Sequence, residues 1–360
     1  MKVLLITPDF APVTGGIQTL LHRLVVHATR LEMRVVTMSH THASIVDDGL
    51  AAPVHRVGAP AGVHSAGVAA LNAQALRVGL RHRPDVVLSG HIVCAPAALA
   101  LRRPVVQYTY AKELGARPRL AKAACARATR TIAISSHTAR LVQEVGTPAE
   151  RIVRIPPGVD LPDHEASTAP DEPLITTVAR LEDRYKGCDI LIAALPVVRR
   201  HVPNARLAVI GEGSMRPWLE SLAESTGMEN AVTFHGALSD DERDAALART
   251  SVLAMPSRLP PNGFGGEGFG IVYLEAGARG IPVIAANVGG ATDAVVHGET
   301  GLLVDPTDHL AVADAIVRIL TDPVLAHRLR AGARPWAERF AWPAIARRVE
   351  DVLMHAAGSL

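Results

Sequence analysis

The stretch VLAMPSRLPPNGFGGEGFGIVYLEAGARGIPVIAAN (252–287) decides the fold. It opens with an apolar run at 252–257 and passes through a glycine-rich segment. An apolar helical pattern then begins near Ile271, and a second apolar run closes the stretch at 282–287. Two buried strands joined by a helix are typical of a parallel sheet covered by helices. The segment therefore predicts one strand–helix–strand unit of an α/β domain.

The same alternation recurs along the chain and predicts two doubly wound, Rossmann-like α/β domains. Segments such as 17–30, 68–82 and 118–128 have the length and apolar spacing of crossover helices. The stretch 155–173, rich in Pro, Asp and Glu, is the predicted linker. Further strands are predicted at 3–7, 34–38, 86–90, 105–108 and 131–135 in the first half, and at 174–180, 206–211, 232–236 and 301–305 in the second.

Length and composition agree with a two-domain globular protein. The chain has 360 residues, more than one core usually holds, and 48% of them are apolar against 20% charged, which excludes a mostly disordered protein. No apolar run reaches 18 residues, and residues 1–16 lack the features of a signal peptide, so a cytoplasmic protein is expected. The 3 cysteines are widely spaced and predict neither a disulfide framework nor a metal cluster.

Charge is distributed unevenly between the halves. Residues 1–160 hold 19 Lys and Arg against 9 Asp and Glu, and 11 of these basic residues fall within 77–130. Most are expected on solvated helix faces, and the alternative is attraction to an anionic substrate or lipid. A nucleic-acid partner is not expected, because no binding motif or aromatic platform accompanies the charge. We expect only weak, salt-sensitive contact with the inner face of an anionic membrane.

Chemistry-bearing residues follow the predicted strands, where ligands of open parallel sheets bind. Gly15 and Gly16 come after the first strand and before a helix, a setting that suits close approach of a phosphate. Arg180 and Lys186 follow the strand at 174–180, and together they can bind a diphosphate. Taken alone, each pair is as well explained by an ordinary turn or surface loop.

The third signal is stronger, because two carboxylates flank a glycine-rich helix start. Seven residues separate Glu267 from Glu275, and Gly265, Gly266, Gly268 and Gly270 surround the first. Backbone N–H groups at such a helix start bind anions, while the carboxylates can accept hydrogen bonds from the hydroxyls of a sugar and of a ribose.

Together these segments resemble glycosyltransferase family 4, the retaining enzymes similar to glycogen synthase and phosphatidylinositol mannosyltransferases, which have the GT-B fold. The Glu-x7-Glu spacing, the Arg180…Lys186-Gly pair and the Gly15-Gly16 loop all match that family's pattern. Segments 155–160, 288–290 and 298–304 are also similar to it, so the resemblance spans nearly the whole chain. One departure is Ser89, which stands where the family usually has a second histidine near His91.

The resemblance implies two domains facing each other across a cleft. Residues 1–157, with a returning helix at 340–360, would bind the acceptor, and residues 158–339 would bind the donor. Arg180 and Lys186 would hold the diphosphate and Glu267 the transferred sugar, with His91 near it. The implied donor-binding residues are Gly15, Gly16, Gly236, Leu238, Gly268, Phe269, Gly270, Ile271 and Glu275.

Acceptor-binding residues are expected in variable loops of the first half, at 39–66 and 107–120, and the candidates are Gln18, Tyr108, Tyr110 and Lys112. No cofactor or metal is expected, because two side-chain cations stabilise the diphosphate. The predicted reaction is hexosyl transfer from a UDP- or GDP-sugar to a hydroxyl of a small soluble acceptor, such as a cyclitol or an aminoglycoside. The alternatives are a mannosyltransferase acting on a lipid-linked acceptor, a nucleotide-sugar-binding protein without activity, and a sugar-nucleotide epimerase.

Overall fold

The computed structural model describes residues 1–58, 64–162, 172–261 and 263–358. The chain divides into two compact units. Unit 1 comprises Met1–Gly158 and Trp342–Leu360, and unit 2 comprises Val159–Ala341. The boundaries expected from the sequence, after residues 157 and 339, lie within two residues of these. Residues 163–171 of the expected linker, and 59–63 of an expected acceptor loop, fall outside the described part.

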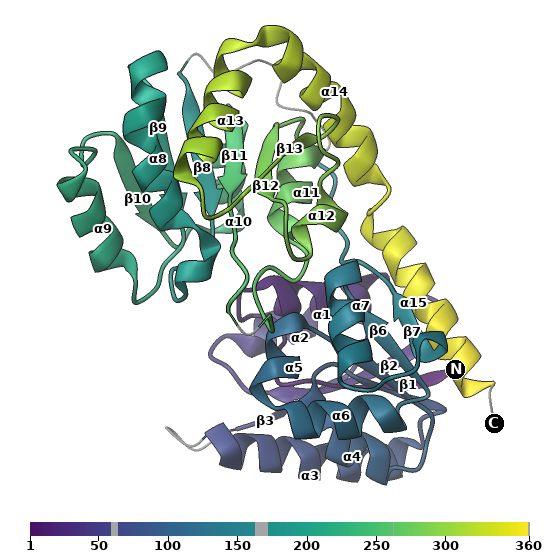
Figure 1. The fold of residues 1–360 in the computed structure, drawn as a ribbon. Coiled ribbons are helices and arrows are strands. Elements are labelled where there is room, and N and C mark those ends of the chain that lie inside the picture. Colours follow the sequence, from purple (N-terminus) through teal and green to yellow (C-terminus); the bar gives the residue numbers. More distant parts are fainter. Residues whose placement is uncertain (59–63, 163–171, 262, 359–360) are drawn as a thin grey trace. The chain divides into compact units, whose positions relative to one another are not determined.

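Unit 1 is a parallel sheet in the order β3-β2-β1-β4-β5-β6-β7, covered by helices on both faces (Figure 1). Its strands are β1 (Lys2–Ile6), β2 (Glu32–Met38), β3 (Val54–Val57), β4 (Val86–Ser89), β5 (Val105–Thr109), β6 (Arg130–Ala133) and β7 (Ile152–Arg154). Its helices are α1 (Gly16–His27), α2 (Ala43–Asp48), α3 (His64–His82), α4 (Ala95–Ala100), α5 (Ala111–Ala116), α6 (Pro118–Arg127), α7 (Ser136–Glu144) and α15 (Trp342–Ala357), with 3-10 turns η1 (Ile92–Cys94) and η2 (Ala149–Arg151).

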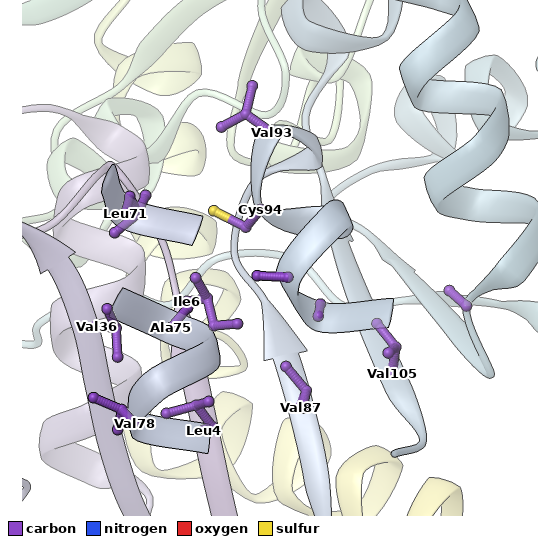
Figure 2. Packing of buried hydrophobic residues seen from close by; sticks show 13 residues of the cluster. Leu4, Ile6, Val36, Leu71, Ala75, Val78, Val87, Val93, Cys94 and Val105 are labelled. Atoms are coloured by element: carbon purple, nitrogen blue, oxygen red, sulfur yellow. The ribbon is translucent and has the colours of Figure 1, made fainter. Parts of the chain in front are cut away.

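The core of unit 1 lies between this sheet and α3. Leu71, Ala75 and Val78 of α3 pack against Leu4 and Ile6 of β1, and neighbouring strands extend the same apolar layer (Figure 2). Leu4, Ile6, Leu71 and Ala75 have no exposed surface, and complete burial of a Leu or Ile side chain stabilises the fold by about 1.5–3 kcal/mol.

The C-terminal helix α15 belongs to unit 1 and packs against α1. The carboxylate of Glu350, which is buried, accepts hydrogen bonds from the backbone N–H of Arg30 at 2.7 Å and from its Nε at 2.6 Å. Ile345, Val349 and Leu353 are buried at helical spacing on the same helix. An ion pair between a buried carboxylate and an exposed guanidinium, together with an apolar face, therefore holds α15 in unit 1.

Unit 2 has the sheet order β10-β9-β8-β11-β12-β13, again with every described pair parallel. Its strands are β8 (Leu174–Val178), β9 (Arg206–Ile210), β10 (Val232–Gly236), β11 (Val252–Met255), β12 (Val283–Ala286) and β13 (Gly301–Val304). Its helices are α8 (Cys188–His201), α9 (Arg216–Ser225), α10 (Asp240–Ala248), α11 (Ile271–Ala278), α12 (Ala291–Ala294), α13 (His309–Thr321) and α14 (Pro323–Glu338), with the 3-10 turn η3 (Arg184–Lys186).

Both sheets confirm the predicted doubly wound fold. In each, the strand order reverses beside the first strand, between β1 and β4 in unit 1 and between β8 and β11 in unit 2. One expectation is corrected: segment 39–66 holds α2 and the edge strand β3, and segment 107–120 holds most of β5, the whole of α5 and the start of α6. The strand β3 was not predicted because its sequence, VHRV, includes two polar residues and lacks the continuous apolar run of an interior strand, as suits an edge strand that is only half-buried.

Candidate functional site

The two reversals of strand order are where ligands of open α/β sheets bind, so the loops after β8 and β11 form the first candidate site. Gly187 closes the loop after β8 with φ of 79°, and a Cβ there would lie 2.2 Å from the carbonyl oxygen of Pro256 after β11. Only glycine permits this backbone and this approach. The two loops are thus packed directly together.

Lys186 and Glu267 meet across these loops. Nζ of Lys186 lies 2.7 Å from Oε2 of Glu267, with side chains only 17% and 11% exposed. Burial alone would lower the pKa of Lys186, but the neighbouring Glu267 carboxylate and Tyr185 outweigh it, and the pKa is raised. The ammonium therefore stays charged at neutral pH, as binding of an anion requires.

A second ion pair supports the same two loops. Nη2 of Arg258, just after β11, donates to both carboxylate oxygens of Asp189, at 2.7 and 2.9 Å, and to the carbonyl of Arg184. Its backbone N–H donates to the carbonyl of Tyr185 at 2.7 Å. The sequence does not predict this pair, because an acidic residue such as Asp189 in the first turn of a helix is already explained by its favourable interaction with the helix dipole.

The glycine-rich helix start predicted from the sequence is the start of α11. Gly270 has φ of 90°, and the ring of Tyr273 lies where its Cβ would be, at 2.2 Å. The Tyr273 hydroxyl donates to the carbonyl of Met255 at 2.6 Å and ties the helix to β11. Gly268, Phe269 and Ile271 complete this segment, whose first-turn N–H groups are suited to an anion.

The other predicted donor residues lie on α11, at and after the end of β10, and in the loop after β8. Glu275 lies on α11, where burial raises its pKa and Arg243 approaches its Oε1 at 3.9 Å. Gly236 ends β10 with φ of 75°, and its backbone faces the Glu212 carboxylate. Leu238 is half-buried two residues on. Arg180 is exposed directly after β8, and no ion pair forms with it in the described part of the chain.

Unit 1 has its own pocket at the corresponding reversal, with a volume of about 430 Å³. Asp9, after β1, and His91, after β4, line it together with Tyr110, Lys112 and Arg117. Gln18 contributes indirectly, since its amide donates to Asp9 Oδ1 at 2.9 Å. Gly15 and Gly16 form the helix start of α1 beside Gln18. Tyr108, also predicted there, is 1% exposed and lies in the core, stacked on Tyr110.

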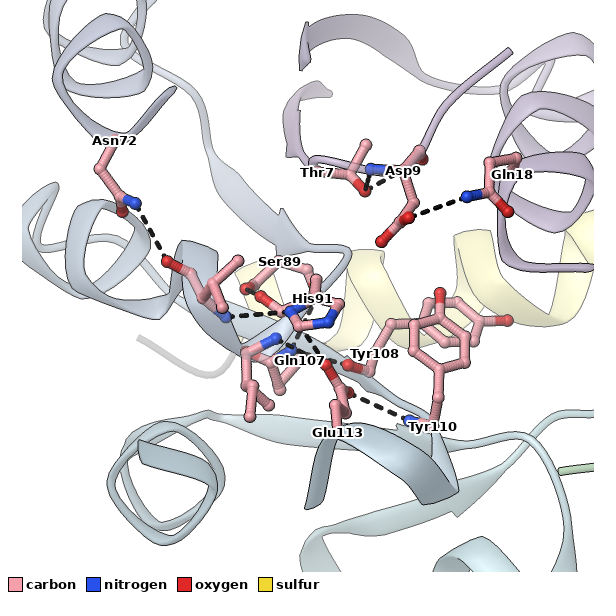
Figure 3. A network of polar contacts seen from close by, with 12 residues as sticks. Thr7, Asp9, Gln18, Asn72, Ser89, His91, Gln107, Tyr108, Tyr110 and Glu113 are labelled. Atoms are coloured by element: carbon pink, nitrogen blue, oxygen red, sulfur yellow. Dashed lines mark hydrogen bonds and ion pairs between the residues drawn. The ribbon is translucent and has the colours of Figure 1, made fainter. Parts of the chain in front are cut away.

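His91 is held by a network that the sequence did not reveal (Figure 3). Its Nδ1 lies 3.1 Å from Oε2 of Glu113 and 3.2 Å from the backbone nitrogen of Val93. Glu113 also accepts hydrogen bonds from the backbone N–H groups of Ile92, at 3.0 Å, and Tyr110, at 3.1 Å. Burial raises the pKa of Glu113 to about 8, although these two backbone donors oppose the rise.

Comparison with known proteins gives this arrangement a family. Residues 14–162 match the protein-family model described as Glycosyltransferase Family 4, and residues 162–336 match the model described as Glycosyl transferases group 1. The GDP-mannose-dependent alpha-(1-6)-phosphatidylinositol monomannoside mannosyltransferase of Mycobacterium tuberculosis is 34% identical, with 98% of each chain covered. The chain belongs to glycosyltransferase family 4. The glycosyltransferase therefore uses a nucleotide sugar.

Two further comparisons concern part of the chain and the fold. The D-inositol 3-phosphate glycosyltransferase of Xylanimonas cellulosilytica is 36% identical over 60% of this chain and 54% of its own. The structure of Anabaena HepE in complex with UDP and glucose superimposes with a TM-score of 0.82, covering 99% of this chain and 100% of that one, at 24% identity. The latter likeness confirms that the glycosyltransferase has the GT-B pair of Rossmann-like units.

No described helix is long and apolar enough to cross a membrane. The described residues hold no cluster of three or more His, Cys, Asp or Glu placed to bind a metal ion. Cys94, Cys125 and Cys188 are buried thiols, free of disulfides.

Proposed function

We propose that this glycosyltransferase transfers mannose from GDP-mannose, with retention of configuration, to a hydroxyl of an inositol-containing acceptor. The pairing of Lys186 with Glu267, at the reversal of the unit 2 sheet, carries the proposal. GDP-mannose is supported by the name of the Mycobacterium tuberculosis relative, and inositol occurs in the names of both relatives.

Unit 2 is the proposed donor-binding unit. The Lys186 ammonium and the exposed Arg180 guanidinium would neutralise the diphosphate, and the N–H groups at the start of α11 would add fixed dipoles. Glu267 would accept hydrogen bonds from mannose hydroxyls, because its second oxygen faces the N–H of Phe269 and leaves the carboxylate oriented. Glu275 and the 236–238 turn would bind the nucleoside.

These cations also support transfer without a divalent metal. Breaking the bond between sugar and diphosphate develops negative charge on the leaving phosphate, which fixed cations stabilise as a metal would. Retention is proposed to proceed with attack on the face from which the phosphate leaves, the phosphate oxygen taking the acceptor proton. No carboxylate of the chain is then needed as a nucleophile.

Unit 1 is the proposed acceptor-binding unit, with the pocket beside His91 as the acceptor site. Its walls combine apolar side chains such as Ile17 and Val68 with polar groups from Asp9, Lys112 and Arg117, which suits a polyhydroxylated ring. A soluble cyclitol stays the first prediction. The phosphatidylinositol monomannoside relative favours a lipid-linked acceptor as the second candidate.

A two-way panel assay tests the proposal. GDP-mannose, UDP-glucose and UDP-N-acetylglucosamine are each combined with myo-inositol, inositol 3-phosphate and phosphatidylinositol monomannoside in mixed micelles, and products are identified by mass spectrometry. We expect a mannosylated product from GDP-mannose. Product with the free cyclitols supports a soluble acceptor, whereas product only in micelles supports the lipid-linked one. Transfer from a UDP-sugar alone would overturn the donor assignment.

A further inference from the structure

Glu113 is a buried acid with an unusual set of partners. Its side chain is 5% exposed, and its two oxygens accept from the backbone N–H groups of Ile92 and Tyr110. Oε2, the oxygen that accepts from Ile92, also lies 3.1 Å from Nδ1 of His91. A capping box at the start of α5 uses only the contact with the Tyr110 N–H, whereas here the carboxyl group also joins η1 and the His91 ring that lines the pocket.

The surroundings of this pair disfavour a net negative charge. Asp9 is the carboxylate that most raises the pKa of Glu113 after burial itself. Cys94 of η1, Cys125 of α6 and Tyr110 are the other titratable groups near Glu113, and the pKa of each is raised, so all three stay neutral at physiological pH. Tyr108 of β5, stacked on Tyr110, is likewise neutral, and Lys112 and Arg117 lie at the pocket wall.

The protons of the pair can be counted. With one proton between Oε2 and Nδ1, the pair is either a carboxylic acid with neutral imidazole or a carboxylate with imidazolium, and Nε2 of His91 bears hydrogen in both. The Val93 N–H, 3.2 Å from Nδ1, favours the first form. When the pair loses one proton, the Glu113 carboxylate, with Oε2 3.1 Å from Nδ1, attracts the remaining imidazole hydrogen to Nδ1. The hydrogen bond from the Val93 N–H to Nδ1 is then lost, and Nε2 becomes an acceptor.

We propose that Glu113 is a positioning residue that sets the tautomer of His91, so that Nε2 is a hydrogen-bond donor at neutral pH and an acceptor once the pair is deprotonated. The inference rests on the proposed function in one respect, namely that His91 touches the reacting sugar or acceptor. A hydroxyl or ring oxygen of the substrate would then receive a hydrogen bond from Nε2 below the titration of the pair and lose it above.

The first test is the pH profile of kcat/KM between pH 6 and 9.5 for the parent, Glu113→Gln and the control Glu144→Gln, which alters an exposed glutamate of α7. The parent and the control should lose activity about tenfold per pH unit above pH ~8. The amide of Glu113→Gln can donate to Nδ1 and does not titrate, so this variant should lack the alkaline limb. The proposal is overturned if Glu113→Gln keeps a limb with the parent's midpoint.

The second test needs neither a folded variant at Glu113 nor turnover. ¹⁵N-imidazole NMR of the full chain, with the His91 signals assigned by their absence in His91→Asn, follows both ring nitrogens with pH. Nε2 should change from protonated to unprotonated near pH 8. A protonated Nε2 up to pH 9.5 would overturn the inference. Absence of transfer from every nucleotide sugar would overturn the proposed function instead, and leave this NMR result standing.

Discussion

Replacing Lys186 by methionine tests whether the cation at the unit 2 reversal holds the donor diphosphate. Methionine keeps the length and apolar stem of lysine and removes the ammonium. The group removed lies 2.7 Å from Glu267 Oε2, and both side chains are less than one-fifth exposed. The variant therefore leaves a largely buried carboxylate without its cation.

The size of the effect follows from that burial. An exposed ion pair contributes up to about 1 kcal/mol, and removing one partner of a fully buried pair costs about 3–5 kcal/mol. For this intermediate pair we expect Lys186→Met to lower the free energy of unfolding by about 2 kcal/mol. The double variant Lys186→Met/Glu267→Gln should recover at least half of this loss, because no unpaired charge remains.

Donor binding should respond separately from stability. Loss of a charge-assisted hydrogen bond of about 1.5–3 kcal/mol weakens GDP binding about 10- to 150-fold, whereas guanosine, which has no phosphate, should bind as before. Urea unfolding and isothermal titration calorimetry measure the two effects, with the exposed Lys122→Met of unit 1 as control. Unchanged GDP affinity in Lys186→Met would refute the diphosphate assignment, and strictly additive unfolding energies would refute the coupling.

Three other predictions concern the remaining charged groups. Burial raises the pKa of Glu113 to about 8 in the folded chain, against 4.5 in the unfolded chain. The free energy of unfolding should therefore be highest below pH 4.5 and fall by at most about 5 kcal/mol as the pH rises to 8. Urea unfolding of Glu113→Gln should show no such fall, and an identical fall in this variant would exclude Glu113 as its source. Arg258→Lys cannot bridge Asp189 and the Arg184 carbonyl as the guanidinium does, so KM for the nucleotide sugar should rise about tenfold, whereas an unchanged KM would show that the loop needs no such support. Transfer should continue in excess EDTA; activity lost there and restored by Mg²⁺ or Mn²⁺ would contradict the assigned role of the cations.

Most of the fold is predictable from the sequence, because the interior strands are continuous apolar runs. The segments 3–7 and 252–257 were recognised on that basis, and β1 and β11 lie within one or two residues of them. The edge strands β3 (Val54–Val57) and β7 (Ile152–Arg154) were missed, since short, half-buried strands carry mixed sequences that resemble loops.

The candidate site likewise contains residues that the sequence predicts and residues that it does not. Lys186 and Glu267 were predicted from their place after strands, and the structure brings their charges together. Glu113 lies in the segment 107–120 that was predicted to bind the acceptor, but its contacts with His91 and Ile92 were not predicted, and neither was the Arg258–Asp189 pair. Each of these contacts joins residues more than twenty positions apart in sequence. A sequence-level hint existed for Glu113, which stands three residues after Tyr110 at the start of a helix, as in a capping box.

The most direct test of the central assignment is to follow GDP-α-mannose and the acceptor by ¹H NMR during the reaction. Loss of the donor's anomeric signal should be matched by a new α-mannoside signal, and Glu267→Gln should slow this conversion by roughly 10²-fold, the scale of one lost transition-state contact. A β-mannoside product would contradict retention. Conversion by Glu267→Gln at the parent's rate would contradict the assignment of the Lys186–Glu267 loop pair as the donor site.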